Sequence, residues 1–331
     1  FKLGSYHEWI VDHIKANPDF IVPASARKEI LSRLEQEPLK DLAISRPSAG
    51  WGVPVPGNEN FVMYTWFDAL INYYSALDEE QQENWPADMH IIGKDILFFH
   101  SVIWPCMLKA LGTELPKQIY VHGMILAADG KKMSKSLGNG VDPNDILKKY
   151  PLDSFRYYLL KNIPSNNDGS FIEDELKDKH NTELGNDFGN LIMRVIKLSL
   201  KIIPAEVSGE GIEQKIDFTE TFNEMKVLME KREHNKALQT LWKTIADINT
   251  YVNDTAPWKL KEQPEELRAV VYNCLFGMHC GATLLSAFIP QTAAKSLIPF
   301  GVELGKFEDI KFGETKYTLS VPEPLFPKLE A

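Results

Sequence analysis

Apolar residues in this chain follow different spacings in different stretches, and the change of spacing predicts where helices and strands lie. In the first 40 residues they recur at helical steps, as in Ile10 with Ile14 and Ile30 with Leu34. This spacing predicts two amphipathic helices, separated at Asn17-Pro18. Between 41 and 60, prolines and glycines exclude a regular helix.

Strand-like and helix-like stretches then alternate. Runs rich in β-branched and aromatic residues occupy 61–67, 89–93 and 118–123, and we expect the second to be a short buried strand. Helical patterns follow the first two runs, beginning at Asp68 and Lys94. This alternation predicts a parallel sheet whose ligand edge carries Gly93 and the lysine-rich loop near residue 132.

Beyond residue 142 the pattern is helical, and we expect no strand between Gly169 and the C-terminal tail. Predicted helices begin at Pro143 and cover 155–160, 171–202, 217–234, 235–255 and 264–288. The predicted fold class is therefore α/β followed by all-α. We expect half of a Rossmann-type sheet over 1–168, a helical bundle over 169–300, and a tail over 301–331 that packs back on the body.

Composition narrows the function classes. A formal net charge of −10 argues against a general nucleic-acid binder, but it leaves room for a local basic path to one RNA. No run of about 18 apolar residues occurs, so we expect no membrane span and a cytoplasmic protein, with an organelle as the alternative. Cys106, Cys274 and Cys280 are scattered without a CxxC pair, which predicts buried reduced thiols and no metal site.

A polar loop carries the clearest chemistry. In Lys132-Met133-Ser134-Lys135-Ser136, two ammonium groups and two hydroxyl groups lie close enough to surround one polyphosphate. A solvated basic turn is the alternative for so short a motif. A kinase-type phosphate site is disfavoured because no glycine-rich Walker loop is present.

Two further groups of residues precede this loop. Gly93 would let backbone approach a ligand and Asp95 could accept hydrogen bonds from a ribose, although an ordinary helix N-cap explains both. An aromatic set suggests a pocket for a slim apolar side chain such as a thioether, with core packing as the alternative. Its members are Trp66, Tyr73, Phe99, His100 and Trp104.

Five blocks, taken in order, resemble methionyl-tRNA synthetase, a class I aminoacyl-tRNA synthetase. They are the stretches 51–57, 66–73, 92–96 with His100 and Trp104, 132–136, and 256–258. The stretch 132–136 matches the KMSKS signature of class I without a substitution. Leu70 stands where other branches have proline, which resembles the bacterial and organellar branch.

The resemblance implies that L-methionine and ATP, with Mg²⁺, give methionyl-adenylate and pyrophosphate, and that tRNA(Met) then receives the methionyl group. It implies catalytic roles for Arg46, Lys132 and Lys135. It places ATP at Gly93, Asp95, Lys132, Met133, Ser134, Lys135 and Ser136. It places methionine at Thr65, Trp66, Ala69, Leu70, Tyr73, Ile96, Phe99, His100 and Trp104.

The resemblance also implies anticodon contacts from Asn190, Arg194 and Trp258 in the bundle. A spacing of four puts Asn190 and Arg194 on one helix face. Stacking and edge hydrogen bonds read unpaired RNA bases, and these residue types supply both. The alternatives are a solvated Asn–Arg pair and a tryptophan that caps the core.

The second class I signature, His-Ile-Gly-His, does not occur in this sequence. We therefore expect an N-terminal half, in the same or a separate chain, to supply it, and we expect this chain alone to be inactive. Two other functions remain open: a non-catalytic tRNA-binding module, and another class I synthetase such as the cysteine or leucine enzyme.

Overall fold

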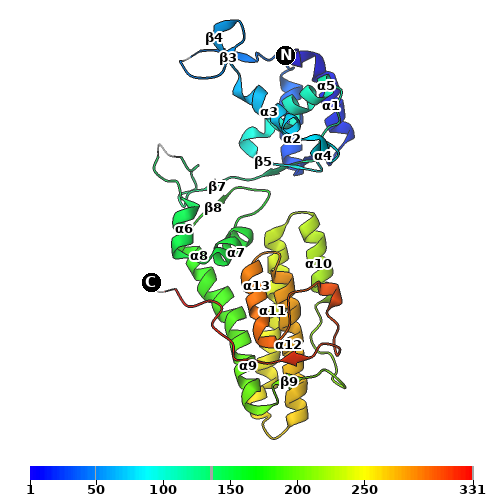
Figure 1. Ribbon diagram of the computed structural model, residues 1–331, viewed down its shortest axis with the longest axis vertical. Coiled ribbons are helices and arrows are strands. Elements are labelled where there is room, and N and C mark those ends of the chain that lie inside the picture. Colours follow the sequence, from blue (N-terminus) through cyan, green and yellow to red (C-terminus); the bar gives the residue numbers. More distant parts are fainter. Residues whose placement is uncertain (49, 135–136, 330–331) are drawn as a thin grey trace. The chain divides into compact units, whose positions relative to one another are not determined.

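The computed structural model describes residues 1–48, 50–134 and 137–329 (Figure 1). Its internal contacts divide the chain into two compact units, Phe1–Met124 and Ile125–Ala331, and each unit has its own hydrophobic core. The three-part division near residues 168 and 300, which came from the sequence pattern, stays a prediction. Among the described residues, no helix has both the length and the apolar character needed to cross a membrane.

The first unit is built on a three-stranded parallel sheet in the order β1-β6-β5. The strands are β1 (Ile21–Val22), β5 (His90–Gly93) and β6 (Ile119–His122). The sequence predicted β5 and β6 but missed β1, which at two residues is too short to show an alternating pattern. Gly93 ends β5 opposite His122, at the carboxyl edge of the sheet.

The prediction that β5 is a short buried strand was right for one of its faces and wrong for the other. Ile92 is 3% exposed and packs in the core, whereas Ile91 is 68% exposed. Successive side chains of a strand point to opposite faces, so only one face of β5 meets the core. In the described part of the sheet, β5 is an edge strand with β6 as its neighbour.

A second, antiparallel sheet has the order β2-β4-β3, with strands β2 (Ser45–Pro47), β3 (Pro54–Val55) and β4 (Asn58–Met63). The predicted strand over 61–67 was wrong at both ends and in its sheet. Trp66 and Phe67 belong to α3 (Thr65–Ser75). Trp66 and Phe67 precede Leu70 and Ile71 by four residues, which is a helical spacing. The packing of this helix against the core outweighs the strand preference of aromatic residues.

Helices cover the parallel sheet and close the core of the first unit (Figure 1). The two helices predicted in the first 40 residues are confirmed, with Ile10 and Ile14 fully buried on one face. Gly112, with φ 73°, ends the helix after β5 in a left-handed C-cap. The helical segments of this unit are η1 (Leu3–Tyr6), α1 (His7–Ala16), α2 (Ala24–Gln36), α3, α4 (Glu79–Gln82), η2 (Lys94–Ile96), η3 (Phe99–Ile103) and α5 (Trp104–Leu111).

The second unit is mainly a helical bundle, as predicted (Figure 1). Its long helix α12 is buried along most of its length, which makes it the central helix of the bundle core. The helices are α6 (Pro143–Lys149), α7 (Leu152–Asn162), α8 (Glu173–Lys179), η4 (His180–Gly189), α9 (Asn190–Ile202), α10 (Thr219–Glu230), α11 (His234–Thr255), η5 (Pro257–Lys259), α12 (Pro264–Leu285), α13 (Pro290–Leu297), η6 (Ile298–Phe300) and η7 (Phe307–Asp309).

Short strands interrupt this bundle, against the expectation of none between Gly169 and the tail. β7 (Ile125–Leu126) pairs with β8 (Gly169–Ser170) in parallel. β9 (Glu206–Val207) pairs antiparallel with β10 (Tyr317–Thr318) of the tail. Each has two residues, so their pairing is set by tertiary contacts and not by a sequence pattern. Tyr317 is fully buried, so this part of the tail belongs to the bundle core.

All three cysteines are buried free thiols, as predicted. Burial raises the pKa of Cys106, Cys274 and Cys280 to about 12. These thiols are therefore protonated and unreactive at neutral pH.

Candidate functional site

An aromatic cluster forms in the first unit where α3 faces the helical segment after β5. The ring of Trp66 stacks on that of Phe99 with centroids 4.4 Å apart, and the ring of Tyr73 lies 5.6 Å from His100. Phe99 and His100 lie in η3, a π-helical turn, a rare form that is frequent at functional sites. The structure thus brings together the aromatic residues that the sequence proposed as a pocket.

A hydrogen-bonded chain fixes the polar end of this cluster. The Tyr73 hydroxyl lies 2.9 Å from Nε2 of His100, and Nδ1 of His100 lies 3.0 Å from the carbonyl oxygen of Ile96. Burial lowers the pKa of His100, so its ring is neutral at pH 7. A carbonyl can only accept, so Nδ1–H donates to Ile96 and Nε2 accepts the Tyr73 hydroxyl proton.

A second histidine, His90, lies in the same cluster and was not predicted from the sequence. Its Nε2 accepts a hydrogen bond from the Trp104 indole at 3.2 Å, and its ring lies 4.5 Å from that of Tyr73. Burial, and then the neighbouring His100, lower the pKa of His90 to about 4. The available signal was the alternation of β5, which puts His90 on the same buried face as Ile92.

The remaining residues predicted for methionine differ in their exposure. Leu70 and Trp104 are 1% and 0% exposed and belong to the core of the unit. Thr65 and Ala69 are exposed on α3, and Ile96 is half-buried beside the cluster. Their direct contact with methionine stays a prediction.

Gly93 and Asp95 are adjacent at the carboxyl end of β5. A Cβ atom on Gly93 would lie 2.9 Å from the Asp95 carboxylate oxygen Oδ1 and 3.7 Å from His122 Cε1. Glycine is therefore needed for the carboxylate of Asp95 to occupy its place. The role of this pair in binding adenosine stays a prediction.

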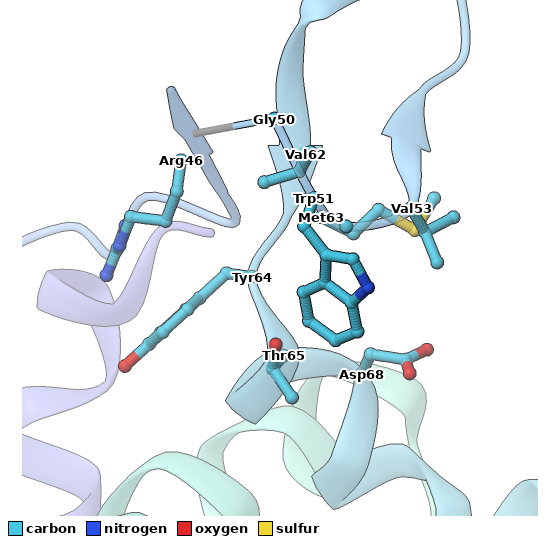
Figure 2. Close-up of a pocket in the computed structure, with 10 residues that line it drawn as sticks. Arg46, Gly50, Trp51, Val53, Val62, Met63, Tyr64, Thr65 and Asp68 are labelled. Carbon is cyan, nitrogen blue, oxygen red and sulfur yellow. The ribbon is translucent and has the colours of Figure 1, made fainter. Parts of the chain in front are cut away.

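Arg46 lines a hollow of about 710 Å³ between the antiparallel sheet and the start of α3 (Figure 2). Its guanidinium lies 3.8 Å above the Tyr64 ring and donates to the carbonyl oxygens of Ala43 and Ser45 at 3.2 and 3.1 Å. These contacts hold the positive charge at one side of the hollow. Figure 2 shows the indole of Trp51 reaching toward Thr65 at the other side.

In the second unit, the side chain of Asn139 braces the lysine loop. It accepts a hydrogen bond from the Ser134 backbone N–H at 2.9 Å and donates to the Lys132 carbonyl at 3.2 Å. Met133 packs against a small core that includes Ile146. Lys135 and Ser136 lie outside the described residues. Asn139 was not predicted as a site residue, although amide side chains commonly bond to loop backbone.

A polar hollow of about 490 Å³ lies on the bundle, and both Asn190 and Arg194 line it. The Arg194 guanidinium donates to Asn249 Oδ1 at 3.3 Å and to Asn253 Oδ1 at 3.2 Å, and both asparagines lie on α11. Asn190 donates to Asn186 Oδ1 at 3.2 Å. Four amide side chains and one guanidinium thus gather here, and two of the amides come from a helix that sequence spacing did not connect to α9.

Trp258 lies in η5, after the left-handed Ala256, and is 42% exposed. Part of this side chain is therefore open to solvent, and both stacking on RNA and packing on the bundle stay predictions. It is not among the residues that line the hollow beside Arg194. The three residues predicted for the anticodon therefore comprise a pair at one hollow and a separate exposed ring.

Comparison with protein families identifies the chain. Residues 1–196 match the family described as tRNA synthetases class I (M), and residues 204–331 match the anticodon binding domain of methionyl tRNA ligase. The chain belongs to the methionyl-tRNA synthetase family. Membership in this family confirms the resemblance seen in the five sequence blocks.

Relatives within the family cover the chain from end to end. The methionine–tRNA ligase of Bacillus subtilis is 40% identical over 352 residues, which include all of this chain and 53% of that protein. That of Thermotoga maritima is 38% identical over 348 residues, with all of this chain and 55% of that protein. The chain therefore spans about half the length of the curated relatives that it matches.

Solved structures of the family agree with the fold. Mycobacterium tuberculosis methionyl-tRNA synthetase in complex with methionyl-adenylate has a TM-score of 0.89 and 34% identity, over 99% of this chain and 68% of that one. Its apo form has a TM-score of 0.87 with 31% identity, over 100% of this chain and 68% of that one. The predicted fold class, half of a Rossmann-type sheet followed by a helical domain, is confirmed.

Proposed function

We propose that this chain is part of a methionine–tRNA ligase. The enzyme would join L-methionine to ATP, release pyrophosphate, and transfer the methionyl group to a terminal ribose hydroxyl of tRNA(Met) as AMP leaves. The observation that carries the proposal is the aromatic cluster with its Tyr73–His100 hydrogen bond, in a chain of this family. A stacked Trp66–Phe99 pair offers ring faces and edges to a thioether.

The chain's charged residues would act on the nucleotide. Lys132 and Lys135 would stabilise the negative charge that builds on the phosphates as pyrophosphate departs, and Arg46 would contribute from its hollow. Gly93 and Asp95 would meet the adenosine. Within the described residues, no group of three His, Cys, Asp or Glu side chains could hold a metal ion. In nucleotide enzymes Mg²⁺ is bound largely through substrate phosphates, so we propose that it arrives with ATP.

The bundle would recognise the tRNA. The amides and guanidinium beside Asn190 and Arg194 can hydrogen-bond to base edges, and the exposed ring of Trp258 can stack on an unpaired base. This polar hollow is also the observation that favours the second candidate, a tRNA-binding module without catalysis.

We further propose that an N-terminal half completes the sheet at β5. Ile91 is 68% exposed on this edge strand, and an added strand with its own covering helices would bury it. The ATP-binding signature that the sequence lacks would come with that segment.

Methionine-dependent exchange of pyrophosphate into ATP tests these proposals. We expect no exchange with this chain purified alone and an enzyme-like rate once the N-terminal half is present. Exchange with cysteine or leucine in place of methionine would assign another class I enzyme. Binding of tRNA without exchange in the completed protein would favour the non-catalytic module. Enzyme-like exchange by this chain alone would contradict the need for a second segment.

A further inference from the structure

Trp51 has no role in the proposed activation of methionine, and it is 89% exposed, more than any other large apolar side chain that the structure describes. An exposed indole beside a hollow offers a flat face on which a base can stack. Trp51 lies in the loop before β3 and its indole reaches over the hollow lined by Arg46, Thr65 and Asp68 (Figure 2).

The loop backbone is packed so that Trp51 starts beside the hollow. Gly50 and Gly52 flank Trp51 with φ of 89° and 133°, conformations that side chains rarely adopt. A Cβ atom on Gly52 would lie 2.9 Å from Cβ and Cγ1 of Val62, so the loop is pressed against β4 at this point. The position of Trp51 at the mouth of the hollow therefore follows from close backbone packing.

The hollow has the groups that bind a nucleotide. The indole offers a flat face for a base, the guanidinium of Arg46 offers positive charge for a phosphate, and Asp68 offers an acceptor for ribose hydroxyls. Its volume of about 710 Å³ is within the range of small-ligand pockets. At its floor, Thr65 immediately precedes Trp66 of the aromatic cluster.

We propose that Trp51 is the stacking platform for the terminal adenine base of tRNA, at the end that receives the methionyl group. This inference rests on the proposed function. The adenosine of ATP is placed instead at Gly93 and Asp95, which do not line this hollow. A base stacked on Trp51 would direct its ribose toward Thr65 and the aromatic cluster, where the methionyl carbonyl must be attacked.

The test compares two reactions of the complete enzyme, including its N-terminal half. We expect Trp51→Ala to lower kcat/KM for aminoacylation of tRNA(Met) roughly 10- to 100-fold, the effect of losing one base-stacking ring. Pyrophosphate exchange without tRNA would change less than about twofold. Trp51→Phe keeps a stacking face and would retain most of the activity. Phe61→Ala, which removes another exposed ring of the same sheet outside the hollow, is the matched control.

The outcomes separate this inference from the function on which it rests. If the unaltered enzyme neither exchanges pyrophosphate nor aminoacylates tRNA(Met), the proposed function fails. If it does both, and Trp51→Ala aminoacylates normally, the platform does not exist. An equal loss in exchange and aminoacylation would show that the ring serves ATP or the activation step, and would overturn the assignment to tRNA. Thermal unfolding of each variant confirms that the fold is intact.

Discussion

Asn249 gives the sharpest prediction for the bundle hollow, because it links two helices through one side chain. Its Oδ1 accepts from the Arg194 guanidinium at 3.3 Å, and its Nδ2 donates to the Asp187 carbonyl at 3.0 Å. Asn253 accepts a second bond from Arg194 at 3.2 Å. Asn249 therefore limits the rotamers of Arg194, and under the proposed function it would act as a positioning residue for contact with RNA.

The size of the expected loss in affinity follows from the rotamer freedom that Arg194 regains in Asn249→Ala. Ordering one long side chain on binding costs about 0.5 to 1.5 kcal/mol. The two bonds to Arg194 are long and exposed, so their direct energies are small. We expect Asn249→Ala to weaken tRNA(Met) binding about 2- to 12-fold, and the double variant with Asn253→Ala to weaken it further.

Fluorescence anisotropy with labelled tRNA(Met) at fixed salt measures this effect, since affinity for RNA depends on ionic strength. Thr250→Ala is the matched control: it removes an exposed side-chain hydrogen bond of α11, from Thr250 to the Ala246 carbonyl, without touching Arg194. A loss that is equal for tRNA with a different anticodon would refute a role in base reading. Tighter binding by Asn249→Ala would refute preorganisation, because it would mean that the asparagines compete with RNA for the guanidinium.

Three further predictions concern the nucleotide and the buried histidines. Lys135→Ala in the complete enzyme should lower the rate of methionine activation at least tenfold with methionine affinity near normal; a large loss of methionine binding by equilibrium dialysis would contradict its phosphate role. Gly93→Ala should raise KM for ATP about tenfold by displacing the Asp95 carboxylate, while the melting temperature stays within a few degrees; an unchanged KM would argue against the adenosine site. Because the pKa of His90 is lowered to about 4 in the folded chain, its stabilising contribution is complete above pH 6.5 and is lost as pH falls toward 4. Urea unfolding should show about 1 to 2 kcal/mol of this loss from His90, after allowance for solvent, and His90→Gln should reduce the pH dependence of stability by that amount, while the other buried histidines, such as His279, keep theirs.

The sequence predicted the elements in which a regular spacing of apolar residues continues over many positions. The amphipathic spacing of Ile10 and Ile14 and the long pattern over 264–288 both became helices. Strands of two residues, such as β1 and β9, have no period to detect, and they form because distant segments meet. The predicted bounds of the strand over 61–67 were wrong because aromatic residues are common both in strands and on the packed faces of helices.

The residues of the candidate site also fall into two groups, those that the sequence predicted and those that it did not. Residues that carry distinctive chemistry in a local motif, such as Trp66 with Tyr73 and the two lysines, were visible from spacing and resemblance. Residues that act through tertiary position were not. His90 joins the aromatic cluster through a ring contact with Tyr73, and Asn249 reaches Arg194 from a helix 55 residues away in sequence. No local spacing in a single sequence links residues that lie so far apart along the chain.

The exposed edge of β5 also governs how the isolated chain will behave in the test tube. Ile91 and the backbone groups beside it form a template for any other strand, including β5 of a second copy. Concentrated preparations of this chain alone will therefore tend to associate edge to edge. An oligomeric state measured on such a preparation would describe this edge, so sizing and light-scattering measurements belong on the protein that includes the N-terminal half proposed to cover β5.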